Sequence, residues 1–229
     1  MSIFTTVERI PGNSLKYKCV IFDCDGVLVD SEVLGSQVFV DFANEYGANI
    51  DLEYAMKHFK GSFLYASMQH VEGIIGKPLP NDFENRYRQK TREVFKEKLQ
   101  PVAGVKAVLQ RLDLPICTAS SGPREKIVSN LANTGLSEFF GDAIFSCYDL
   151  GKWKPDPAIF LFAAKSMGFA PSECVVIEDS IFGALAAQRG GFDVFGYTAH
   201  EKSPDFIVKC TAVFDNMEQL VPMIMRENG

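Results

Sequence analysis

Two aspartates separated by one residue, Asp23 and Asp25, follow an apolar run in the stretch "VIFDCDGVLVDSE". Residues two apart in an extended backbone project to the same side, so both carboxylates can face one point. Gly26 then lets the chain turn sharply and brings backbone N–H groups close to a ligand. An aspartate that only caps a helix is the structural alternative, but "DSE" at 30–32 already supplies a helix start. The pair therefore indicates chemistry rather than capping.

Polar side chains also follow three later apolar runs. "PICTASSGPREK" ends with Ser120 and Ser121 before a helix, where hydroxyls and free N–H groups suit an anionic oxygen. "KWKPDP" contains Lys154, a point charge suited to a phosphate. "CVVIEDS" ends in Glu178 and Asp179, which are costly after an apolar strand unless a cation compensates them. Each signal alone has a structural alternative: a capping serine, a solvated lysine, or a capping aspartate beside a solvated glutamate.

Taken together, these four groups of residues indicate one site. Open α/β sheets bind ligands at the carboxyl ends of their strands. Several acids in one cleft demand a hard cation with oxygen ligands, and Mg²⁺ in such sites usually adds waters and substrate phosphate. A lysine and a serine would complete a cradle for a phosphoryl group. The residues themselves therefore predict Mg²⁺-dependent phosphoryl transfer.

The elements that must position these residues form an α/β pattern. Strand-like apolar runs alternate with helical patterns, which predicts a Rossmann-like parallel sheet with helices on both faces. The runs are almost continuously apolar, as expected when both faces of a sheet are buried. The predicted strands are 18–22, 115–120, 143–146, 174–178, 193–197 and 212–214, and the predicted helices between them are 102–111, 123–133, 156–167, 180–189 and 216–226.

The interval between the first two strands is too long for one crossover, at about ninety residues. It contains helical patterns at 32–46, 51–58, 62–75 and 81–99. We predict a helical cap domain over 33–99, inserted into an α/β core domain formed by 15–32 and 100–229. Residues 1–14 are predicted to be an N-terminal extension.

Composition narrows the class of protein. The 229 residues carry a formal net charge of −6, which argues against a nucleic-acid-binding surface. The six cysteines have no CxxC pair and no regular spacing, which is typical of reduced thiols. The first residues lack the apolar segment of a signal peptide, and no stretch reaches membrane-spanning length. We expect a cytoplasmic protein, monomeric or weakly dimeric, that binds neither nucleic acid nor membrane.

"DCDGVLVDS", the strand-end serine, "KPDP" and "EDS", in this order, resemble the four motifs of the haloacid dehalogenase-like superfamily. The helical insert is similar to the class I cap of that superfamily. The resemblance implies that Asp23 is a nucleophile that forms an aspartyl-phosphate. Asp25 would protonate the leaving oxygen and then activate water. Ser120 would bind the transferring phosphoryl oxygens, and Lys154 would neutralise them.

The same resemblance implies the metal ligands. Asp179 would ligate Mg²⁺ together with Asp23 and the backbone carbonyl of Asp25. Glu178 would be a further ligand, or would act on the metal through water. The haloacid dehalogenases and phosphonoacetaldehyde hydrolases of the superfamily lack an acid at the position of Asp25, so both activities are disfavoured.

"DCDGVLVDSEVL", "FKGSFLY" and "YDLGKWKPDPAIF" look most like the bacterial 6-phosphogluconate phosphatase branch. This resemblance implies a small-molecule phosphate ester as substrate, either a sugar phosphate or a phosphorylated sugar acid. The candidate substrate contacts are Ser121, Lys60, Tyr65 and Arg124. The glycine between Lys60 and Tyr65 can equally end a helix, and Arg124 can equally be a surface charge.

Two alternatives remain open. A β-phosphoglucomutase has the same core motifs, but the histidine of its first cap helix aligns with Gly35. His58 and His70 lie elsewhere in the insert and are predicted to be surface or packing residues. The chain could also be a non-catalytic binding module, because a fold does not determine function. The complete set of acids and the lysine disfavours that alternative.

Overall fold

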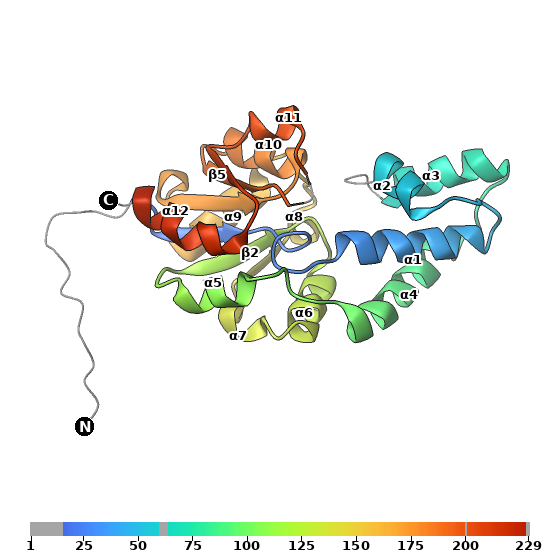
Figure 1. Cartoon of the computed structure of the whole chain (residues 1–229), viewed down its shortest axis with the longest axis horizontal. Coiled ribbons are helices and arrows are strands. Elements are labelled where there is room, and N and C mark those ends of the chain that lie inside the picture. The colour runs from blue at the N-terminus through green and yellow to red at the C-terminus, as the bar shows by residue number, and fades with distance from the viewer. Residues whose placement is uncertain (1–15, 60–63, 200, 228–229) are drawn as a thin grey trace, which may run out of the picture.

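The computed structural model describes residues 16–59, 64–199 and 201–227, and its sheet is the predicted one. The strands pair in parallel in the order β3-β2-β1-β4-β5-β6. This arrangement confirms the predicted α/β fold class (Figure 1). The strands are β1 (Cys19–Phe22), β2 (Ile116–Ser120), β3 (Ile144–Ser146), β4 (Cys174–Glu178), β5 (Asp193–Tyr197) and β6 (Ala212–Phe214).

Strand β1 lies in the middle of the sheet, between β2 and β4. Phe22, its last residue, is paired with Thr118 of β2 and with Ile177 of β4. The chain moves from β1 to β2 and β3 on one side, and then crosses to β4 on the other. The crevice at such a reversal of strand order is where open α/β sheets bind ligands. The residues that follow β1 and β4 therefore emerge side by side at a binding edge.

Both faces of β1 are buried, which explains its continuous apolar run. Val20 and Phe22 belong to one apolar cluster, which also contains residues of the helices on that face of the sheet. Cys19 and Ile21 belong to a second cluster, on the opposite face. Alternate residues of a strand point to opposite faces, so an alternating polar pattern could not occur here.

The helices around the sheet include several short turns that the sequence did not predict. Four-residue helices show too little periodicity to be recognised, and the predicted helix 216–226 is a 3₁₀ turn followed by an α-helix. The longer helices are α5 (Val105–Arg111), α6 (Arg124–Asn133), α9 (Ala158–Met167), α10 (Ile181–Arg189) and α12 (Leu220–Glu227). The short ones are α7 (Ser137–Phe140), α8 (Cys147–Leu150), α11 (Pro204–Ile207), η1 (Pro171–Glu173) and η2 (Met217–Gln219).

The long interval after β1 forms helices with an apolar cluster of their own. Figure 1 shows them beyond the end of the sheet to which β1 leads. The cluster contains Phe39, Phe42, Val71 and Phe83, and the rings of Phe42 and Phe83 are 4.8 Å apart. These helices are α1 (Glu32–Asn44), α2 (Leu52–His58), α3 (Leu64–Ile75) and α4 (Phe83–Lys98). The assignment of 33–99 as a separate domain stays a prediction.

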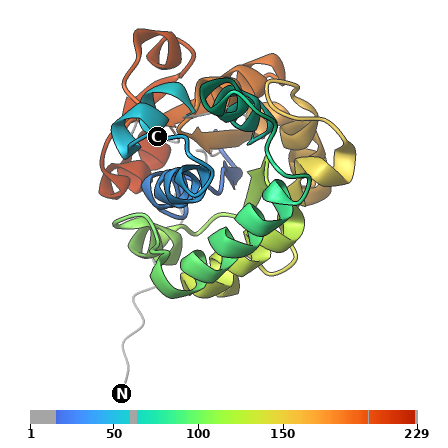
Figure 2. The ribbon, with the colours of Figure 1, turned by 90° about the vertical axis from the view of Figure 1, so that its right-hand side faces the viewer.

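Helix α4 connects this helical group to the core. Its residue Phe95 and the following Leu99 are buried in the apolar cluster that contains Val20 and Phe22 of β1. Helix α4 also contacts α6, and Figure 2 shows the two helices running beside each other. With 16 residues, α4 is the longest described helix, and no described helix is long and apolar enough to cross a membrane.

Phe83 tests how much the apolar cluster of the inserted helices contributes to the stability of the protein. Phe83→Ala is expected to lower the free energy of unfolding by about 3–5 kcal/mol, because it removes a fully buried ring from the cluster. Phe182→Ala is the matched control: that side chain is 44% exposed, so the expected change is about 0.5 kcal/mol or less. Urea unfolding followed by circular dichroism measures both. Equal losses would contradict the packing described here.

Candidate active site

Asp23 is the first residue after β1, and its carboxylate is held by a lysine from a distant segment. Its backbone N–H donates to the carbonyl oxygen of Ile177 at 2.9 Å, which extends the pairing of β1 with β4. Lys154 Nζ donates to Asp23 Oδ1 at 2.6 Å. Burial raises the pKa of Asp23 to about 7, aided by the charge of Glu178 and opposed by Lys154. A cation beside this carboxylate would favour its ionised form.

Lys154 bridges two carboxylates in a nearly closed environment. Its Nζ also donates to Glu178 Oε1 at 2.6 Å, and the side chain is only 5% exposed. Burial alone would lower the pKa of Lys154, but Asp23 and Glu178 raise it above the ordinary value. The ammonium group is therefore a fixed positive charge at the ends of β1 and β4.

Glu178, the last residue of β4, uses both of its carboxylate oxygens. Its Oε1 accepts from Lys154, and its Oε2 accepts from the backbone N–H of Asp179 and from both the N–H and the hydroxyl of Ser180. Gly183 of α10 makes room for this group, because a Cβ there would lie 1.8 Å from Glu178 Oε1. Glu178 thus fixes Lys154 and the turn that follows β4.

Asp179 differs from its neighbours because its carboxylate is buried without a cationic partner. Within the described ranges its side chain makes no hydrogen bond or ion pair, and the residue is 5% exposed. Burial raises the pKa of Asp179 well above its usual value, and the charges of Glu178 and Asp23 add to this. Gly26, at φ +80°, lies against it: a Cβ on Gly26 would be 2.0 Å from Asp179 Oδ2.

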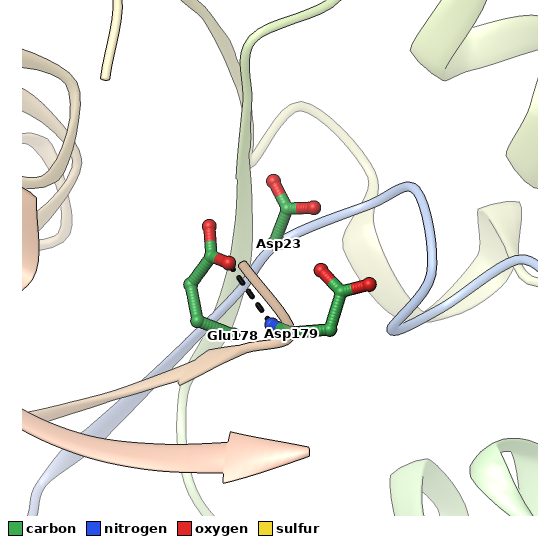
Figure 3. A group of neighbouring side chains, drawn as sticks. All are labelled: Asp23, Glu178 and Asp179. Atoms are coloured by element: carbon green, nitrogen blue, oxygen red, sulfur yellow. Dashed lines mark hydrogen bonds between the residues drawn. The ribbon is translucent and has the colours of Figure 1, made fainter. Parts of the chain in front are cut away.

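The three acids form a set of oxygen donors that fits a hard divalent cation. Asp23, Glu178 and Asp179 each offer an oxygen, and these oxygens lie within 4.8 Å of one another. Figure 3 shows their side chains rising on the same side from the ends of β1 and β4. Lys154 compensates only part of their charge, and buried charges require compensation. Glu178 already accepts four hydrogen bonds, whereas the side chain of Asp179 accepts none from the described residues, so Asp179 has the most lone pairs left for a cation. The assignment of Glu178 as a metal ligand stays a prediction.

Asp25 lies outside this group of three and has a lysine of its own. Its Oδ1 accepts from the hydroxyl of Ser31 at 2.7 Å, and its Oδ2 accepts from Lys126 Nζ at 2.7 Å. Burial alone would raise the pKa of Asp25, but Lys126 and the hydroxyl of Ser31 outweigh burial and hold it below the usual value. The two aspartates therefore have different environments although one residue separates them.

The site opens into a cavity of about 680 Å³ between the end of the sheet and the inserted helices. Ser120 ends β2, and its hydroxyl accepts from the N–H of Gly122 at 3.1 Å. The predicted residues that line this cavity are Asp23, Asp25, Ser120, Ser121, Lys154, Glu178 and Asp179. Residues from four separate parts of the sequence thus meet in one place.

The other predicted substrate contacts do not join them. The guanidinium of Arg124 donates to the carbonyl oxygen of Ile144 and lies 3.9 Å from Asp149, so it points along the edge of the sheet. Tyr65 is 69% exposed, and its hydroxyl accepts from Gln69. Neither residue lines the cavity. Lys60 lies outside the described residues.

Three cationic residues of the cavity wall were missed by sequence reasoning: Lys126 of α6, and Arg88 and Arg92 of α4. Lys126 follows Arg124 by two residues, and only the rotation of the helix decides which of them faces the cavity. The sequence gives only a weak indication that the two arginines of α4 act together. They are spaced by four residues on a charged helix, which places them on one face.

Residues 17–191 match the family model of haloacid dehalogenase-like hydrolases. The chain belongs to the haloacid dehalogenase-like hydrolase family. It is also 33% identical over 215 residues to the 6-phosphogluconate phosphatase of Escherichia coli, which covers 93% of this chain and 97% of that relative. The predicted family and the predicted class of enzyme, a phosphoric monoester hydrolase, are confirmed.

Solved structures of haloacid dehalogenase-like proteins share the fold. One is a conserved protein of unknown function from Agrobacterium tumefaciens, 30% identical, with a TM-score of 0.83 over 93% of this chain and 100% of that one. Another is a hydrolase from Deinococcus radiodurans solved with bound phosphate and sodium. It is 26% identical, with a TM-score of 0.79 over 93% of this chain and 97% of that one.

Gly26 tests the geometry of the acidic group. Gly26→Ala is expected to reduce hydrolysis of p-nitrophenyl phosphate by about 100-fold or more, because the methyl group would displace Asp179. Gly47→Ala is the matched control: Gly47 has φ +94° and no atom within 4 Å of a Cβ, so it carries the backbone strain of about 1–2 kcal/mol without the clash. Similar rates for the two variants would contradict this geometry.

Proposed function

We propose that the protein is a Mg²⁺-dependent phosphatase that hydrolyses a sugar phosphate or a phosphorylated sugar acid through an aspartyl-phosphate. The observation that carries the proposal is the environment of Asp23. Its carboxylate lies at the switch point of the sheet, 2.6 Å from Lys154, grouped with two further buried acids, and at the wall of a cavity large enough for a small phosphate ester.

In the first step, an oxygen of Asp23 attacks phosphorus as the bond to the leaving oxygen breaks. Lys154 Nζ donates to Oδ1, so Oδ2 is the oxygen free to attack phosphorus, and the second lone pair of Oδ1 is left for a metal. Lys126 favours the ionised form of Asp25 in the free protein, but the negative charge of a bound phosphate ester opposes this effect. Asp25 can then carry the proton that it gives to the leaving oxygen, which departs as an alcohol. Ser120 and Lys154 stabilise the negative charge on the transferring oxygens. The product is a phosphate ester on the carboxyl group of Asp23.

In the second step, water attacks the phosphorus of this aspartyl-phosphate. Asp25, now a carboxylate, accepts a proton from the water, and the bond between phosphorus and the Asp23 oxygen breaks. Inorganic phosphate leaves, and both aspartates return to their starting forms. Dividing the reaction in this way replaces one hard displacement by two easier ones.

The carboxylates of Asp23 and Asp179, with the backbone carbonyl of Asp25, would hold the Mg²⁺ ion. When bound, the ion supplies the positive charge that the acidic group lacks and shields Asp23 from the negative phosphoryl oxygens. Glu178 contributes by holding Lys154 and the turn at Asp179 in place. Its role is therefore to orient the ligands rather than to bind the ion directly.

The wall of the cavity that α4 provides supports an anionic substrate. Arg88 Nε donates to Glu84 at 2.8 Å, whereas Arg92 has no acidic partner in the part of the chain that the structure describes. A phosphorylated sugar acid carries a carboxylate remote from its phosphate, and a guanidinium is well suited to bind it. The 6-phosphogluconate phosphatase relative agrees with a substrate of this class.

A phosphoglucomutase activity is less consistent with the cavity. Gly35, the position where such an enzyme would place its histidine, lines the cavity, and no described lining residue is a histidine. His70 instead accepts or donates a hydrogen bond at 2.8 Å with the hydroxyl of Tyr54, and its ring lies 5.6 Å from that of His58. A non-catalytic binding module would not need the complete set of acids and lysine around Asp23.

Asp23 tests the mechanism. Asp23→Asn is expected to reduce the release of phosphate from 6-phosphogluconate on the order of 10⁴-fold or more, because the nucleophile is lost. Chelation of divalent cations should abolish wild-type activity, and added Mg²⁺ should restore it. The exposed Asp142→Asn variant serves as a control and should retain wild-type rates. Phosphate release by Asp23→Asn in saturating chelator would refute the mechanism, and isomerised product without phosphate would indicate a mutase.

Arg92 tests the substrate class. Arg92→Gln is expected to raise KM for 6-phosphogluconate about tenfold, which corresponds to the loss of roughly 1.4 kcal/mol from one charge-assisted contact. KM for a sugar phosphate without a carboxylate, such as glucose 6-phosphate, should change little. Lys90→Gln removes a charge from α4 outside the cavity and is the control. Equal increases for both substrates would show that Arg92 does not recognise a carboxylate.

A further inference from the structure

Lys126 has no role in the steps described above, although it is the residue that holds Asp25. It lies in the first turn of α6, the helix that begins four residues after the end of β2 at Ser120. Its ion pair with Asp25 joins residues 101 positions apart in the sequence. Its side chain is 35% exposed, so the ammonium group reaches the cavity rather than a closed core.

Both oxygens of Asp25 are held, and each is held from a different side. Lys126 Nζ donates to Oδ2 from the helix that follows β2, and the hydroxyl of Ser31 donates to Oδ1 from the start of the inserted helices. A terminal carboxylate torsion is broad when nothing restrains it. Two anchors at 2.7 Å define the plane of this carboxylate, whereas one anchor alone would leave the group free to rotate.

The same lysine lies beside the hydroxyl assigned to the phosphoryl group. A Cβ added at Gly122 would lie 3.5 Å from both Lys126 Cδ and Ser120 Oγ, and 3.9 Å from Asp25 Oδ2. These three groups therefore surround one small space. The carboxylate that Lys126 holds therefore lies near the serine hydroxyl that the proposed mechanism assigns to the phosphoryl oxygens.

Each member of the aspartate pair thus has its own lysine, and the two lysines come from different parts of the chain. Lys154 holds Asp23, and Lys126 holds Asp25. We propose that Lys126 is a positioning residue that fixes the carboxylate of Asp25 for its two proton transfers. The inference rests on the proposed phosphatase function, because it gives Lys126 a part in that reaction.

This role has a kinetic signature that depends on the leaving group. An alkoxide leaving from a sugar phosphate needs a proton, whereas p-nitrophenolate is weakly basic and leaves without one. Asp25 must still activate water in the second step for either substrate. A misplaced Asp25 therefore leaves the formation of aspartyl-phosphate from p-nitrophenyl phosphate almost unchanged and slows its hydrolysis. The aryl substrate should then give a burst of p-nitrophenolate followed by slow turnover.

Lys126→Met tests this signature in stopped-flow and steady-state assays with Mg²⁺. Turnover of 6-phosphogluconate is expected to fall about tenfold to 100-fold, a part of what a proton-transfer group contributes. The burst with p-nitrophenyl phosphate should approach one equivalent per active site, at a rate within about threefold of the first wild-type turnover. Lys126→Arg keeps a donor to the carboxylate and should recover part of the lost turnover. Lys165→Met, an exposed lysine of α9, is the control.

Ser31→Ala provides a second route that leaves α6 intact. It removes the other anchor of Asp25 and should give the same burst with a smaller loss of turnover, so the inference can be tested even if Lys126→Met does not fold. A burst slowed as much as the turnover would overturn the inference and assign Lys126 to phosphoryl binding. Wild-type kinetics in both variants would also overturn it. Activity in Asp23→Asn would instead refute the phosphatase mechanism itself.

Discussion

The ammonium of Lys154 lies between the carboxylates of Asp23 and Glu178, and the shape of the site depends on these two contacts. All three side chains are nearly buried, so removing one partner would leave an uncompensated charge in the interior. Backbone hydrogen bonds hold β1 and β4 together as far as Ile177. Beyond that point, the ion pairs of Lys154 with Asp23 and Glu178 link the two segments. Asp179 then remains as the acid that a metal ion must satisfy.

In the proposed function, the chemistry depends on the ends of the central strands, and the selection of substrate depends on helix α4. The ends of the central strands provide Asp23 and the acids around it, and these positions are fixed by the sheet. Helix α4 provides Arg88 and Arg92 to the opposite wall of the cavity. The same helix is anchored in the core through Phe95, so the wall it forms has a defined position relative to the strands.

The sequence was sufficient to predict the strands and the residues that follow them. β1 is buried on both faces, which gives a continuous apolar run, and the polar residues after such runs lie at one edge of a parallel sheet. The directions of helical side chains could not be predicted. Arg124 and Lys126 differ by two positions, about 200° around a helix, and only Lys126 faces the cavity. The hydrogen bonds that Glu178 accepts could not be predicted from the sequence either, because two of their donors are backbone N–H groups of the turn that follows β4.

The arrangement of α4 has a consequence for the choice of substrate. Its stabilising contacts with the core come from Phe95, whereas Arg92 projects into the cavity and is exposed. Exchanging an exposed side chain removes little buried apolar surface and therefore costs little folding free energy. Substitutions along this face of α4 can accordingly change which substrates the cavity accepts, while the residues at the strand ends of this chain stay in place.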